Sequence, residues 1–198
     1  MYQLLGRATS GNVQKVIFLL EELNLPYERL DYGRQFENTV TPAYLALNPT
    51  QKVPTLVDGE LSIWESHTIL RYLAAKEKSA LLPTDLAART QVERWMDWLL
   101  AQLNSAYLGG FRDAKKPEAE RAADTAKNLT TELTILEKQL AKNDWVAGSE
   151  FSLADIALGS IVKRCVAFPF NLPAMPHIAA WLEKLNARDS FKKATAAG

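Results

Sequence analysis

The first 80 residues mix two hydrophobic periods, one typical of strands and one typical of helices. Residues 10–24 place apolar side chains at i, i+3, i+4 and i+7 from Val13, which predicts a helix with one buried face. Strands are expected at 2–6, 27–32, 55–57 and 61–63, further helices at 42–47 and 65–78, and a loop at 33–41. The order β-α-β-α-β-β-α predicts an α/β domain, in which helices cover a mixed sheet.

The pattern changes after residue 78, because no convincing strand follows. Residues 79–85 resemble a linker that ends in a helix cap, and helices are expected at 86–109, 117–142, 152–166 and 176–188. Ser152 stands three residues before Asp155, close to a capping box, and the helix that it opens is apolar nearly all round. We therefore expect three parts: an α/β domain at 1–78, a linker at 79–85 and an all-α domain at 86–198. The small residues at 194–198 are expected to fray.

Composition narrows the classes of function. The chain has 198 residues, and its 23 basic and 23 acidic residues give a formal net charge of zero, which argues against a nucleic-acid-binding protein. Its single cysteine, Cys165, excludes an intrachain disulfide and fits a reducing compartment. No apolar run approaches 18 residues and no signal peptide is apparent at the start. We expect a cytoplasmic protein without a membrane partner.

The Val53-Pro54 dipeptide has two interpretations. An ordinary trans proline can open an edge strand. A cis proline would instead expose the backbone N–H and C=O of Val53, which could then pair with an extended peptide. The dipeptide alone favours the ordinary trans form.

Glu65-Ser66 and Ser10 both stand where a helix is expected to begin. Each serine could simply cap its helix, but the free N–H groups of a helix start also bind carboxylates. Glu65 could hold an ammonium beside such a carboxylate, so one site could take both ends of an α-amino acid. A nucleophilic Ser10 would need an adjacent base. The chain has only two histidines, and a serine hydrolase is disfavoured.

Taken together, these segments resemble the glutathione S-transferase family. The resemblance is carried by SGN at 10–12, NPTQKVPTLVDG at 48–59, WESHTILRYLA at 64–74, RWMDW at 94–98, AGSEFSLADIALG at 147–159 and PHIAAWLEKLNAR at 176–188. It spans residues 1–192 and is similar to bacterial theta-like members that have serine at the active position. It implies a thioredoxin-like N-terminal domain, an all-helical C-terminal domain, a cytoplasmic detoxification enzyme and a homodimer with the helices from Glu65 and Leu86 at its interface.

The resemblance also implies how glutathione would lie, with no metal involved. The γ-glutamyl end would bind at Glu65 and Ser66, and the cysteinyl backbone would pair with Val53 beside a cis Pro54. The glycine carboxylate would meet Lys52 and Gln51. The loop before this motif has Arg34, Gln35 and Asn38 but lacks the histidine of some members, so the glycine contact stays open, and Phe36 only covers the site.

The thiol of glutathione would point at Ser10, with Thr9 and Asn12 as rivals or helpers in binding the thiolate. A small hydrophobic electrophile would lie between the domains, and its pocket is expected to include Tyr107, Phe111, Arg112 and Phe168. For each aromatic residue, core packing is an equal alternative. Cys165 is expected to serve packing alone.

Two other functions remain open beside glutathione transfer to an electrophile. The same fold could serve as a non-catalytic binding or partner-docking protein. It could also be a specialised glutathione-dependent isomerase, dehalogenase or peroxidase.

Overall fold

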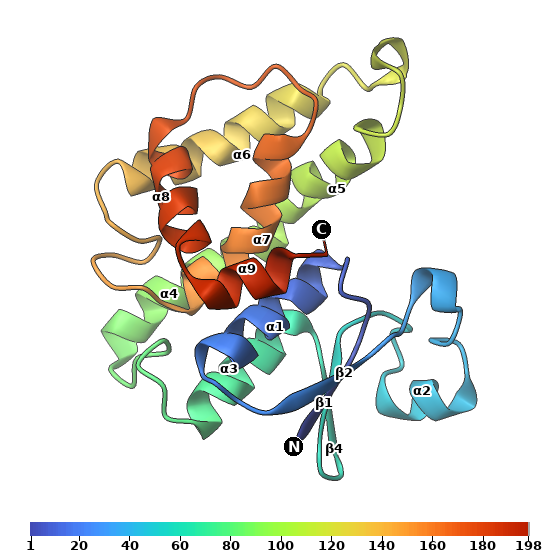
Figure 1. The fold of residues 1–198 in the computed structure, drawn as a ribbon. Helices are drawn as coiled ribbons and strands as arrows, with labels where there is room; N and C mark the ends of the chain where they lie inside the picture. The colour runs from blue at the N-terminus through green and yellow to red at the C-terminus, as the bar shows by residue number, and fades with distance from the viewer. Residues whose placement is uncertain (198) are drawn as a thin grey trace. The chain divides into compact units, whose positions relative to one another are not determined.

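A computed structural model describes residues 1–197, whose contacts divide the chain into two units (Figure 1). The first unit comprises Met1–Ser79 together with the chain from Asn186 onward, and the second comprises Ala80–Leu185. The C-terminal segment therefore belongs with the N-terminal residues by its contacts.

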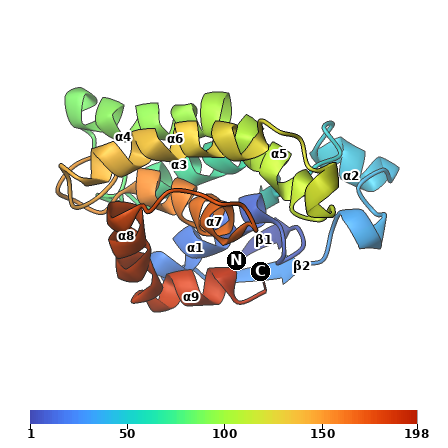
Figure 2. The ribbon, with the colours of Figure 1, turned by 90° about the horizontal axis from the view of Figure 1, so that it is seen from above.

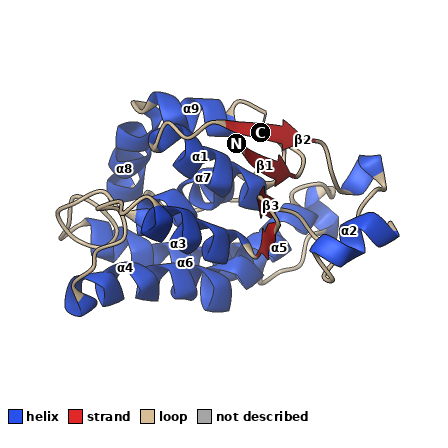
Figure 3. Ribbon diagram, turned by 90° about the horizontal axis from the view of Figure 1, so that it is seen from below, coloured by secondary structure: helices blue, strands red, loops and turns tan. Residues whose placement is uncertain are grey.

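The first unit is built on a mixed four-stranded sheet, as the sequence predicted. Its strands are β1 (Tyr2–Leu5), β2 (Tyr27–Leu30), β3 (Thr55–Asp58) and β4 (Leu61–Trp64). They lie in the order β2-β1-β3-β4, with β1 parallel to β2 and antiparallel to β3, and β3 antiparallel to β4 (Figure 3). The loop between β3 and β4 turns at Gly59, whose φ of 61° suits glycine.

Three helices of the first unit match the predicted ones. They are α1 (Gly11–Glu22), α2 (Pro42–Leu47) and α3 (Ser66–Lys76). The apolar face of α1 is buried, and α1 packs against α3 on the same side of the sheet (Figure 1). The expected loop at 33–41 also contains a single 3-10 turn, η1 (Arg34–Phe36).

A further helix, α9 (Asp189–Thr195), was not predicted and packs along α1. The carboxylate of Glu22 accepts hydrogen bonds from the Arg188 guanidinium and, at 2.5 Å, from the Ser190 hydroxyl. The rings of Phe18 and Phe191 lie 5.1 Å apart between their centroids. The expected fraying from residue 194 is wrong for the start of that segment, because residue 194 is buried within α9.

The second unit contains helices joined by loops in its described residues, with one isolated β-bridge between Trp145 and Gly148. It contains α4 (Leu86–Trp98), the π-helical turn η2 (Leu99–Leu103), α5 (Asn104–Asp113), the 3-10 turn η3 (Glu118–Glu120), α6 (Thr125–Leu140), α7 (Leu153–Ala167) and α8 (Pro176–Asn186). Figure 2 shows α4, η2 and α5 as one continuous rod with α6 alongside. The predicted helix at 86–109 therefore exists and continues to Asp113.

The helix expected at 117–142 begins only at Thr125. The carboxylate of Asp113 accepts hydrogen bonds from the Thr125 hydroxyl at 2.5 Å, the Ala122 N–H at 3.0 Å and the Lys116 ammonium at 2.7 Å. This network gathers residues 113–125 around one carboxylate. The backbone before Thr125 is bent into a loop, which apolar periodicity could not indicate.

Helix α7 forms the core of the second unit, as predicted. Ser152 and Asp155 make a complete capping box at its start. The Ser152 hydroxyl accepts a backbone N–H of the first turn, and the Asp155 carboxylate accepts the Ser152 N–H. Nearly all side chains from Leu153 to Val162 are buried. Cys165 is buried on the same helix, and burial raises the pKa of its thiol to about 12, which suits a packing role.

Candidate functional site

Three segments of the first unit meet at one edge of the sheet. The register pairs Leu5 of β1 with Thr55 of β3, and Thr55 with Trp64 of β4. The chain that follows β1, the chain that precedes β3 and the chain that follows β4 therefore lie together. These are the segments in which the sequence predicted a binding site.

Val53 precedes a cis peptide bond to Pro54, so the trans alternative is wrong. Among the described residues, no hydrogen bond to the backbone N–H or C=O of Val53 is formed. Its side chain is packed, because a Cβ placed on Gly6 or on Gly33 would lie 3.3 Å from Val53 atoms. Val53 is thus held by its side chain, while its backbone N–H and C=O stay unpaired within the described chain, as pairing with an extended partner would require.

A buried polar network supports this segment from beneath, and sequence reasoning missed it. The carbonyl oxygen of Lys52 accepts the Tyr44 hydroxyl at 2.5 Å and the Asn48 side-chain amide at 2.9 Å. Both side chains also hydrogen-bond the Thr55 hydroxyl. The side-chain amide oxygen of Asn48 accepts the Thr50 N–H at 2.9 Å, an Asx turn that the Asn-Pro pair could have signalled. The network fixes the backbone direction just before Val53.

Gln51 and Lys52 have exposed side chains at this edge. Gln51 adopts a φ of 59°, which is uncommon for a residue other than glycine. In the neighbouring loop, the Asn38 side chain accepts the Gly33 N–H at 3.0 Å and donates to the Asp31 carbonyl at 2.9 Å. Asn38 therefore shapes the loop that precedes the site.

Glu65 and Ser66 lie at the start of α3 with different environments. Glu65 is exposed and has a φ of 68°, a left-handed conformation that costs about 1–3 kcal/mol and is often found at ligand sites. Its side chain makes no capping bond to α3 within the described chain. Ser66 is 4% exposed and is the first residue of α3, where free N–H groups attract anions.

Ser10 immediately precedes α1 and is 8% exposed. Its N–H donates to the Arg7 carbonyl at 3.1 Å, and its own carbonyl accepts the Gln14 N–H at 2.9 Å. Within the part of the chain that the structure describes, its hydroxyl does not cap α1. Thr9 and Asn12 are exposed on either side. The structure thus brings all three candidate thiolate donors to the start of one helix.

Three of the residues predicted for an electrophile pocket lie together in the second unit. The ring centroid of Tyr107 lies 6.2 Å from that of Phe111 and 6.0 Å from that of Phe168, with the second pair stacked. Gly110 allows this packing, since a Cβ there would lie 2.9 Å from the Phe168 ring. Arg112 is exposed nearby in sequence. The cluster can present an aromatic surface to an apolar molecule.

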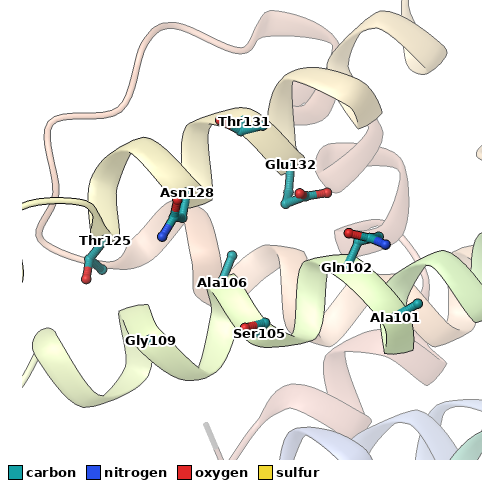
Figure 4. A pocket seen from close by; sticks show the side chains of 9 residues that line it. All are labelled: Ala101, Gln102, Ser105, Ala106, Gly109, Thr125, Asn128, Thr131 and Glu132. Carbon is teal, nitrogen blue, oxygen red and sulfur yellow. The ribbon is translucent and has the colours of Figure 1, made fainter.

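A separate groove of about 390 Å³ runs between α5 and α6 (Figure 4). Its lining residues are Ala101, Gln102, Ser105, Ala106, Gly109, Thr125, Asn128, Thr131 and Glu132. The lining is mostly polar, and Figure 4 shows Gln102 and Glu132 on facing sides of it. None of the residues predicted for the site lies in this groove.

The described residues contain neither a candidate membrane span nor a candidate metal cluster. No described helix is both long and apolar enough to cross a membrane. No group of three or more His, Cys, Asp or Glu side chains in the described chain has a geometry that could hold a metal ion.

Comparison with known proteins now adds the family. The family model "Glutathione S-transferase, N-terminal domain" matches residues 2–75, and "Glutathione S-transferase, C-terminal domain" matches residues 67–189. The chain therefore belongs to the glutathione S-transferase family, and it is an enzyme that uses glutathione as cosubstrate.

Individual relatives agree with the family models. The chain is 36% identical over 201 residues to glutathione S-transferase GstB of Escherichia coli K12, covering 98% of this chain and 97% of that protein. It is 33% identical to glutathione S-transferase 3 of Zea mays, with 98% and 93% covered. A theta class glutathione S-transferase of Xanthomonas axonopodis pv. citri, solved with glutathione bound, matches with a TM-score of 0.91 and 36% identity, covering 100% of this chain and 98% of that one.

Proposed function

We propose that this transferase binds glutathione along the sheet edge, extended from Glu65-Ser66 past Val53 to Ser10. The proposal is supported most by Val53, whose backbone N–H and C=O are unpaired within the described chain although its side chain and its preceding carbonyl are fixed. A backbone held in this way is suited to pair with the cysteinyl residue of an extended tripeptide.

The γ-glutamyl group would be held by opposite charges. Its carboxylate would bind the first N–H groups of α3 and the Ser66 hydroxyl, and its ammonium would bind the exposed Glu65 carboxylate. At the other end, the glycine carboxylate would meet the Lys52 ammonium and the Gln51 amide, both of which are exposed.

The proposed catalytic step is ionisation of the bound thiol. A free thiol has a pKa of about 8.5, so lowering it by about two units requires about 2.7 kcal/mol. A hydrogen bond from the Ser10 hydroxyl to the thiolate would supply roughly 1.5–3 kcal/mol, and the N-terminus of α1 about 0.3–1 kcal/mol more. Thr9 and Asn12 are the alternative donors.

The electrophile is proposed to be small and hydrophobic, because Tyr107, Phe111 and Phe168 form an aromatic cluster that could contact it. Arg112 would interact with an anionic group on such a molecule. The proposed setting is cytoplasmic detoxification by a homodimer that uses α3 and α4 at its interface. Sedimentation showing a monomer at micromolar concentration would contradict the dimer.

The binding mode is tested by nuclear magnetic resonance of the backbone amides during a glutathione titration. We expect the Val53 N–H to shift downfield and to gain protection from exchange, because it acquires an acceptor. The hairpin amide of Gly59, which lies at the opposite end of β3, serves as the internal control. An unchanged Val53 amide at saturating glutathione would refute this mode.

A further inference from the structure

A lysine and a histidine form a buried contact beneath the proposed glutathione site. Lys15 comes from α1 and His67 from α3, and each is only 2% exposed. The Lys15 Nζ lies 3.1 Å from the His67 Nε2, within hydrogen-bonding distance. Lysine is rarely buried so completely, so this pair requires an explanation.

The pair holds one positive charge at most near neutral pH, since two cations 3.1 Å apart in a protein core repel strongly. Burial lowers the pKa of Lys15 from 10.5 to about 7, and attraction to the Glu65 carboxylate partly opposes this. When Lys15 is an ammonium it donates to the His67 Nε2, which requires neutral His67 with its proton on Nδ1.

The pair links the two helices that begin at the proposed site. Lys15 follows Ser10 by five residues on α1, and His67 directly follows Ser66 on α3. The carboxylate of Glu65, in the turn between β4 and α3, attracts the Lys15 ammonium. The charged groups that α9 brings to α1 bind farther along the helix, at Glu21 and Glu22. Strand β1 has no charged side chain.

We propose that Lys15 and His67 are positioning residues that join the thiol end of the glutathione site to its γ-glutamyl end, and that glutathione affinity follows the charge on Lys15. The inference rests on the proposed binding mode. In this role the pair acts through Ser10 and Ser66, which contact glutathione in the proposed binding mode.

The direction of the effect follows from the charges. Glutathione carries two carboxylates and one ammonium, and the ammonium is already matched by Glu65. The carboxylate at the start of α3 is then balanced by Lys15 only while Lys15 is protonated, which is the case below its pKa. Binding should therefore raise the proton affinity of Lys15, and glutathione affinity should fall as the pH rises through about 7.

The test uses S-methylglutathione, because it has no thiol whose ionisation could be confused with that of Lys15. Calorimetry on the wild-type protein should show a dissociation constant that rises about three- to tenfold more between roughly pH 6 and pH 8.5 than that of Lys15→Met, with proton uptake already at about pH 6.5, where the ligand's ammonium is still almost fully protonated. Lys15→Met should bind more weakly than the wild type at pH 6, and should keep only the pH dependence that comes from the ligand's own ammonium, which has a pKa of about 8. Exposed Lys127→Met is the matched control and should behave as wild type.

Two histidine variants separate positioning from simple packing. His67→Gln retains an acceptor for the Lys15 ammonium and should keep the pH dependence. His67→Leu removes the acceptor and should move the inflection to lower pH. A packing role alone would weaken binding equally at every pH, and that result would overturn the proposal.

The wild-type protein gives a decisive result even if Lys15→Met does not fold. Proton uptake on binding is obtained by repeating the calorimetry in two buffers of different ionisation enthalpy. Binding with no proton uptake at about pH 6.5, where the ligand's ammonium is still almost fully protonated, would overturn the inference while leaving the proposed binding mode intact. Failure of S-methylglutathione to bind at any pH would instead refute the binding mode itself.

Discussion

The indole N–H of Trp181 donates a hydrogen bond of 2.9 Å to the Oδ1 of Asp155 in the core of the second unit. The same carboxylate accepts the Val146 N–H at 3.0 Å and, through Oδ2, the N–H and hydroxyl of Ser152. Burial raises the pKa of Asp155, and these four donors oppose that effect. One carboxylate thus joins α7, α8 and the segment before α7.

Replacing Asp155 with asparagine should destabilise the second unit by about 2–4 kcal/mol, because an amide nitrogen would face donors that need an acceptor. Urea unfolding followed by tryptophan fluorescence measures the change. Asp144→Asn is the control, since Asp144 forms only an exposed ion pair with Lys184 and its loss should cost about 0–1 kcal/mol. Equal effects of the two variants would contradict the central role of Asp155.

Ser10→Ala should raise the pKa of the bound thiol of glutathione by about one to two units, the equivalent of one hydrogen bond to a charged group. Glutathione affinity should change little, because most of the peptide is held elsewhere. The ultraviolet absorbance of the thiolate, titrated with pH, reports the shift. Thr9→Ala and Asn12→Ala are the comparison variants, and an unchanged titration in Ser10→Ala would transfer the role to one of them.

Glu65→Gln should weaken glutathione binding about tenfold or more, because it removes the charge that holds the ammonium. The variant should unfold at nearly the wild-type temperature, since the Glu65 side chain is exposed and does not cap α3 in the described structure. The dipeptide Cys-Gly, which lacks the γ-glutamyl group, provides the discriminating ligand. If the variant weakens both ligands equally, Glu65 does not contact the γ-glutamyl end.

Stability should fall as the pH drops below about 4.5, in part through Glu22. Burial would raise the pKa of Glu22, but hydrogen bonds from Arg188 and Ser190 outweigh it and leave the folded-state pKa below 4.5. Between the folded-state pKa of Glu22 and about 4.5, the unfolded chain binds more protons than the folded chain. The stability that Glu22 contributes is therefore present above this pH range and is lost as the pH falls through it. Glu22→Gln should remove part of this acid sensitivity. Glu28→Gln, at an exposed position of β2, is the control.

Hydrophobic periodicity predicted most helices because their buried faces are long and regular, whereas the four-residue strands were predicted from short apolar or alternating runs bounded by turn residues. It missed α9, since seven residues with three charged side chains show little period, and the helix depends on Glu22 far away in the sequence. It also extended α6 too early, because one carboxylate, that of Asp113, reorganises the preceding backbone. Tertiary hydrogen bonds decided both outcomes.

The candidate site residues also fall into those that the sequence could indicate and those that depend on tertiary packing. Ser10, Val53 and Glu65-Ser66 could be proposed as site residues because they stand at element boundaries that the sequence marks, and the strand register places those boundaries at one edge. The contact between Lys15 and His67 could not be predicted, because an isolated lysine and histidine on predicted helices are expected to face solvent. Their contact exists only once α1 and α3 have packed together.

The packing of α9 on α1 has a consequence for the order in which the chain acquires structure. Residues 80–185 supply the whole second unit, whereas the first unit needs both ends of the sequence. During synthesis from the N-terminus, the helical unit can close before Phe191 and Ser190 reach their partners on α1. The thioredoxin-like unit begins first and is completed last, so glutathione binding should arise only after residues 189–195 have left the ribosome.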